Sequence, residues 1–142
     1  MSAENLEQRQ APDFGADELG RVKFVPCKGS ISGLCLTRCI DESFLIGYYQ
    51  SGNFIQFQLL FWNNTPKEEG VTIATSVFRD KFQLQSQQHT FKIGKAYQLE
   101  NTDIRLVPHK YSLEHGPVEI NFVIDAPRNI PILRTELINK PK

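Results

Sequence analysis

The sequence contains little that would support catalysis, metal binding or covalent cross-linking. Its 142 residues include three cysteines, three histidines and one tryptophan. It has no glycine-rich phosphate loop, no GxSxG or HExxH motif and no acidic cluster of the DxD type. The histidines and cysteines also lack the CxxC or HxxxH spacing of a zinc site. We therefore expect a protein that is not an enzyme and that requires no cofactor or metal.

Long apolar runs are absent as well. No segment is apolar over the length needed to cross a bilayer, and the N-terminal residues lack the apolar stretch of a secretory signal. These absences predict a protein of the cytosol or nucleus. Cys27, Cys35 and Cys39 are an odd number, and in a reducing compartment we expect them to be free thiols.

Charge is balanced overall but unevenly distributed. Residues 1–20 carry five acidic side chains and one basic side chain, whereas the other 122 residues carry 15 bases and 11 acids. The first segment is predicted to be a disordered acidic tail, followed by one folded domain at 21–138 and a short tail at 139–142. The mild basic excess of the domain is compatible with a polyanion ligand.

Residues 54–78 carry the clearest structural pattern. Their alternation of apolar and polar side chains predicts two antiparallel strands joined by a polar turn at 63–70. Phe61 is expected on the apolar face of the first strand. Phe78 falls instead in phase with small polar residues on the opposite face. The residues predicted to share one core are Ile55, Phe57, Leu59, Val71, Ile73, Ile120 and Phe122.

The remaining elements complete an all-β prediction. In chain order they are a strand at 22–26, a strand at 30–40 with a bend at Gly33, a mobile connection at 41–53, a short helix or irregular cap between 79 and 94, a strand pair or bent strand at 95–107, a loop at 108–117, a strand at 118–125 and a short helix or edge segment near 130–137. About five principal strands and a short helical cap predict a five-stranded OB-fold barrel. An unrelated β-sandwich binding module is the alternative.

Several aromatic and basic residues fall outside the core pattern. Exposed aromatic rings can stack on bases, and Lys and Arg can neutralise phosphates, as a groove for single-stranded nucleic acid requires. The loops of an OB barrel would bring such residues to one side. The candidates are Tyr48, Tyr49, Phe78, Arg79, Lys81, Arg105, Lys110 and Tyr111.

The segments TIATSVF, KAYQLENTDIRLVPHKY and VEINFVIDAP resemble the first high-affinity DNA-binding OB domain of the replication protein A large subunit, over roughly residues 22–133. The resemblance implies that Phe78 and Tyr111 stack on bases, that Arg105 contacts the backbone and that Glu119 faces the groove. The segment DESFLIGYYQSGN departs from the family because it has tyrosines but no Lys or Arg. This departure fits a specialised relative, such as a meiotic or telomeric one.

We therefore expect a non-catalytic domain that binds single-stranded DNA in a nuclear protein of replication, recombination or telomere maintenance. Single-stranded RNA is left open as a ligand. The alternative is an OB-fold scaffold that binds proteins in a multi-subunit complex and has weak or no affinity for nucleic acid. The neutral net charge and the acidic tail favour the alternative, and the placement of Phe78 and Tyr111 favours DNA binding.

Overall fold

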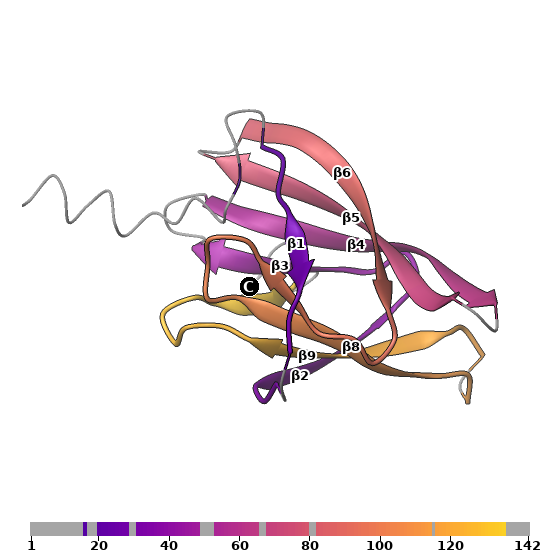
Figure 1. Cartoon of the computed structure of the whole chain (residues 1–142). Coiled ribbons are helices and arrows are strands. Elements are labelled where there is room, and N and C mark those ends of the chain that lie inside the picture. Colours follow the sequence, from indigo (N-terminus) through magenta and orange to yellow (C-terminus); the bar gives the residue numbers. More distant parts are fainter. Residues whose placement is uncertain are drawn as a thin grey trace, which may run out of the picture.

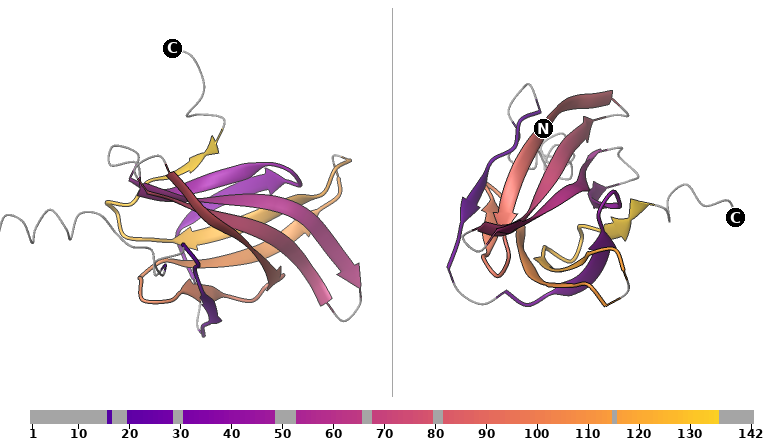
Figure 2. Two further views of the ribbon diagram at one scale, coloured as in Figure 1. Left: turned by 90° about the horizontal axis from the view of Figure 1, so that it is seen from above. Right: turned by 90° about the vertical axis from the view of Figure 1, so that its right-hand side faces the viewer.

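The computed structural model describes Ala16 and residues 20–28, 31–48, 53–65, 68–79, 82–114 and 116–135. In these residues ten β-strands form two antiparallel sheets of five strands, stacked in two layers (Figures 1 and 2). Sheet A has the order β1-β7-β8-β9-β2, and sheet B has the order β10-β3-β4-β5-β6. The strands are β1 (Phe24–Pro26), β2 (Leu34–Cys39), β3 (Ser43–Tyr48), β4 (Asn53–Thr65), β5 (Glu68–Arg79), β6 (Phe82–Lys92), β7 (Tyr97–Leu99), β8 (Arg105–Ser112), β9 (Glu119–Asp125) and β10 (Ile132–Arg134).

The core lies between the facing sides of the two sheets. All seven predicted core residues are buried and fully inaccessible to solvent, which confirms the phase of β4, β5 and β9. Phe44 joins the layers, because its ring stacks on Phe57 of sheet B at 4.8 Å and lies 5.4 Å from Phe122 of sheet A. Apolar side chains from both sheets thus form one continuous core.

The β4–β5 hairpin confirms the predicted antiparallel pair, with one correction. The register shifts between Leu59 and Phe61, so Leu60 is an extra residue that forms a β-bulge. Beyond the bulge the alternation is reversed: Phe61 points out of the sandwich and is 55% exposed, whereas Trp62 lies against the core. The prediction that Phe61 belongs to the core face is therefore wrong.

The all-β prediction is confirmed, but the OB barrel with a helical cap is not. In the described part of the chain the strands form two separate sheets, and no strand pairing joins one sheet to the other. The residues predicted to form the cap are the long strand β6, which pairs with β5 along most of its length. Backbone pairing with β5 outweighs the weak helical preference of a glutamine-rich segment.

Two predicted connections are also strands. The segment expected as a mobile loop at 41–53 contains β3, which pairs with β4. The loop expected at 108–117 is largely the second half of β8, where Pro108 is accommodated beside a register shift. At the C-terminal end the expected edge segment is confirmed as β10, and residues 136–137 of the predicted helix or edge segment lie outside the described residues. No helix in the described residues is long and apolar enough to cross a membrane.

The segment before β1 closes one side of the sandwich. Gly20 lies directly against Leu84 of β6, and the Val22 amide donates to the Gln87 side chain. Phe24, the first residue of β1, places its ring 5.0 Å from Phe91 of β6, while its backbone pairs with Leu99 of β7 in sheet A. β1 thus crosses from the side of β6 to the edge of sheet A (Figure 1). Most of the predicted acidic tail lies outside the described residues, although Ala16 packs against the core.

Candidate ligand-binding face

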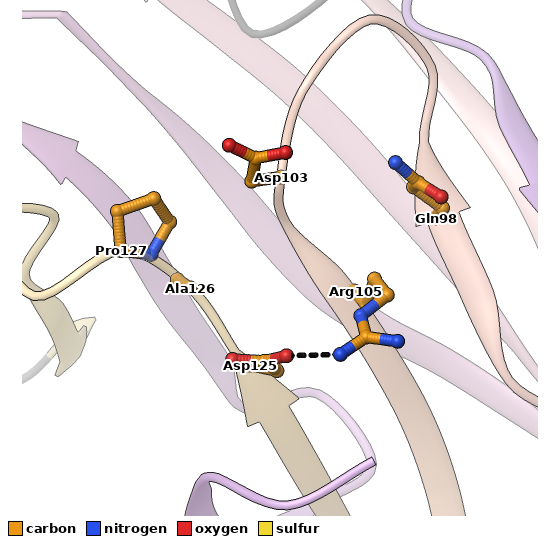
Figure 3. Close-up of a pocket in the computed structure, with 6 residues that line it drawn as sticks. All are labelled: Gln98, Asp103, Arg105, Asp125, Ala126 and Pro127. Carbon is orange, nitrogen blue, oxygen red and sulfur yellow. Dashed lines mark hydrogen bonds and ion pairs between the residues drawn. The ribbon is translucent and has the colours of Figure 1, made fainter. Parts of the chain in front are cut away.

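Arg105, predicted to neutralise phosphate, lies on the outer face of sheet A. Its guanidinium donates a hydrogen bond to Asp125 at 2.5 Å, which raises the pKa of Arg105 (Figure 3). Gln98 and Asp103 line the same open hollow of about 450 Å³. The guanidinium therefore already has an anionic partner, and a second acid lies nearby.

The other predicted residues of sheet A surround a different hollow. Lys110 and Glu119 line an open depression of about 710 Å³ on the same outer face. Tyr111 is half-buried, and its ring lies 4.6 Å from that of Trp62 in sheet B. This contact links the two layers at one end of the sandwich, so Tyr111 contributes to packing.

Phe78 lies at the opposite end of the molecule. It is on the outer face of sheet B, where its ring stacks on Phe54 with centroids 4.7 Å apart. Phe54 and Trp62 are eight residues apart on β4, or roughly 25 Å along a strand. The structure therefore does not bring Phe78 and Tyr111 together as one stacking site.

The remaining predicted residues add little to a single groove. Arg79 follows Phe78 in β5 and is paired with Phe82 of β6. Tyr49 and Lys81 lie outside the described residues, and of Tyr48 only the backbone, at the end of β3, is described. The nine predicted positions are thus distributed over both sheets or are undescribed.

A different surface stands out, which we call the β4–β6 face: the outer side of β4, β5 and β6. Strand register aligns its side chains in three rows across the sheet. The rows are Gln56–Ser76–Ser86, Gln58–Ala74–Gln88 and Phe61–Thr72–Thr90. None of these side chains is charged. Rows two residues apart and strands about 4.8 Å apart give these three rows a length of about 14 Å and a width of about 10 Å.

Many polar groups on this face are available to a ligand. Gln58, Ser86, Gln88 and Thr90 are exposed. The Gln58 and Gln88 amides make no hydrogen bond within the described residues, whereas Gln56 donates to Ser43 at 3.2 Å. Aromatic rings bound the face, with Phe61 at one end and the Phe54–Phe78 stack at the other.

The face is hollowed beside Phe61. An open depression of about 580 Å³ lies at the hairpin end of β4 and β5, and Lys92 is the one charged side chain among the described residues that line it. Gly70 forms part of its floor, where a Cβ would lie 2.7 Å from the Phe91 carbonyl oxygen. A side chain at this position would therefore strain the sheet and fill the depression.

Sequence reasoning missed this face for an identifiable reason. The Phe-Gln alternation of β4 ends at the pair Leu59–Leu60, and two adjacent leucines break a period of two. This doublet was the available signal for the bulge that turns Phe61 outward. The glutamine-rich segment 83–88 was the second signal, because alternate members of it would face solvent in a strand.

Comparison of the chain with protein-family models, curated proteins and solved structures finds no match. The resemblance to replication protein A stays a prediction. Among the described residues no group of three His, Cys, Asp or Glu side chains could hold a metal ion.

Proposed function

We propose that this domain is a non-catalytic binding module of the β-sandwich type whose ligand is a carbohydrate, bound on the β4–β6 face. The observation that carries the proposal is the composition of that face. Its three central rows combine exposed amides and hydroxyls with an exposed phenylalanine and contain no charge. Double-sheet β-proteins include lectin domains, although fold alone does not define function.

The other sheet provides an internal comparison. The outer face of sheet A carries charged side chains of both signs on β8 and β9, as solvent-exposed protein surfaces ordinarily do. Arg105, Lys110, Glu119 and Asp125 all lie there. The same chain thus has one ordinary charged face and one face whose three central rows are neutral and rich in amides, which supports a specialised role for the β4–β6 face.

The chemistry of the β4–β6 face suits a polyhydroxylated ligand. Each sugar hydroxyl both donates and accepts hydrogen bonds, and so do the Gln amide and the Ser or Thr hydroxyl. A sugar ring also has an apolar side formed by its C–H groups, which can pack on an aromatic ring such as Phe61. Neutral partners avoid the desolvation cost of burying a charge.

The direct test is binding of the purified chain to a glycan array, followed by calorimetry on the oligosaccharides it retains. The variant Gln58→Ala/Gln88→Ala removes two exposed amides, so we expect it to lose at least about tenfold in affinity, near 1.4 kcal/mol. A matched variant on sheet A, Lys110→Ala, should bind like the wild type. If the folded wild-type chain retains no glycan on the array, the proposal is wrong.

Single-stranded DNA is a second candidate, supported by one observation. Phe78 is stacked on Phe54 at the edge of the β4–β6 face, and Arg79 follows it in sequence. Base stacking on these rings would involve this end of sheet B without the predicted OB barrel and without Tyr111. Titration with labelled oligo-dT at low salt tests it: this candidate requires binding that weakens steeply as salt is raised and that Phe78→Ala reduces.

A further inference from the structure

The depression beside Phe61 has an unusual balance of hydrogen-bonding groups. Asn63 of β4 and Thr90 and Lys92 of β6 line it, and each carries a hydrogen-bond donor; the Thr90 hydroxyl also lies 3.2 Å from the Thr72 hydroxyl. Gly70 separates Asn63 from Lys92 in the same row of the sheet, so no side chain stands between these two donors. A small group can therefore approach both donors at once.

The positive charge in this depression is not neutralised. No acidic side chain lines it in the part of the chain that the structure describes. Within the same residues the Lys92 ammonium has no ion pair, and the Asn63 amide has no hydrogen bond. The Lys92 backbone is fixed because its amide donates to the Tyr97 hydroxyl at 3.0 Å.

We propose that this depression binds an anionic substituent, a sulfate or a carboxylate, of a glycan whose neutral part lies along the β4–β6 face. The inference rests on the proposed function and specifies its ligand class. Lys92 supplies the charge, and Asn63 and Thr90 supply neutral donors to the remaining oxygens. The anion lies next to Phe61, so one ligand would contact the ring and the cation together.

The test compares matched glycans on one array: each neutral oligosaccharide beside its sulfated form and its carboxylate-bearing form. At low salt the wild-type chain should prefer the anionic members by about fivefold, the upper range for an exposed ion pair. Lys92→Gln should remove this preference and leave the affinity for the neutral parent unchanged. Lys92→Arg should retain the preference.

Lys95→Gln is the matched control, because Lys95 is exposed and lines a separate hollow with Cys35 and Val107 on sheet A. It should keep the wild-type preference. Circular dichroism melts of all variants confirm folding. Equal affinity for neutral and anionic glycans, or a preference that survives in Lys92→Gln, overturns the inference but leaves the proposed function standing.

Two further outcomes separate the alternatives. Loss of binding to neutral and anionic glycans alike overturns the proposed function and this inference with it. Titration of inorganic sulfate without glycan distinguishes the source of the anion. If sulfate alone binds the wild type as tightly as the sulfated glycan does, the depression is a site for a free anion, and the glycan inference is wrong.

Discussion

Phe61 is an aromatic residue whose surroundings do not match its chemistry. A phenylalanine ring that is 55% exposed contributes little to folding, because most of its apolar surface stays in water. We predict that Phe61→Ala leaves the free energy of unfolding within about 0.5 kcal/mol of wild type. It should weaken glycan binding by at least about fivefold, as expected for a buried aromatic contact at an interface. Denaturant unfolding and calorimetry on the same samples measure both quantities.

Phe122 is the matched control for Phe61, because it is a phenylalanine with no exposed surface in the centre of the core. Phe122→Ala should lower the free energy of unfolding by about 3–5 kcal/mol. If Phe61→Ala is equally destabilising, the ring is a structural element and the outward phase of β4 beyond the bulge is incorrect.

His89 makes the stability of the domain depend on pH. It faces inward from β6, beside Phe24 and Phe91, and hydrogen-bonds Thr75 at 3.0 Å; burial lowers its pKa below the ordinary 6.5. The unfolded chain therefore takes up this proton first as pH falls. Its contribution to stability is complete above about pH 6.5 and is lost as pH falls toward the folded-state pKa.

The measurement is the free energy of unfolding of wild type and His89→Gln between about pH 5 and 8. The wild type should lose stability toward acid more steeply than the variant does. Parallel curves for the two proteins would show that other groups set the pH dependence.

At the level of elements, the sequence predicts a strand best where one face is strictly apolar. Residues 54–59, 71–77 and 118–125 alternate in this way, and their inward faces are as predicted. β6 was not predictable on this basis, because polar residues, mostly glutamines, occupy both of its faces over residues 85–88. The sequence alone therefore does not indicate which face is covered by sheet A. The layer arrangement was not predictable either, since a barrel and a sandwich use the same alternation and differ only in which strands pair.

Predicting the β4–β6 face from the sequence would have required a finer detail, the position of a β-bulge. The outward direction of Phe61, at one end of the face, results from one extra residue in β4. A shift of one position reverses the direction of every later side chain in a strand. The predicted binding residues were chosen by residue type and by resemblance. The structure shows that several of their partners, such as Asp125 for Arg105 and Trp62 for Tyr111, are supplied by neighbouring strands.

The bulge at Leu60 is therefore the place in β4 where we predict that loss of one residue is tolerated. Deletion of Leu60 removes the extra residue, so Phe61 would directly follow the inward Leu59 and should stay exposed, with Trp62 still against the core. Because Trp62 is the single tryptophan of the chain, its fluorescence emission should stay at the wild-type wavelength, and glycan binding should be retained. Leu60→Ala keeps the residue count and should also preserve both signals. A shift of the emission to longer wavelength on deletion would show that the side chains beyond Leu60 have reversed.

At the level of the whole molecule, the two outer faces should respond differently to ionic strength. Binding of a neutral glycan to the uncharged central rows of the β4–β6 face should change little between about 50 and 200 mM salt, a range over which phosphate contacts weaken strongly. Arg105→Ala, on the opposite sheet, should leave that binding unaltered. Calorimetry at the two salt concentrations, with wild type and variant, measures this. If glycan affinity falls steeply with salt and Arg105→Ala removes this dependence, the glycan binds on sheet A instead.

The order of the strands also constrains how the chain can fold. β2 pairs with β9, which follows it by more than eighty residues, whereas β3 to β6 pair with their neighbours in sequence. During synthesis the β3–β6 meander can form early, but β2 lacks its partner until β9 has left the ribosome. Its apolar residue Leu36 would until then remain uncovered by β9. Closure of this long-range pairing should therefore be the slow step of folding, as in other domains dominated by contacts between distant segments.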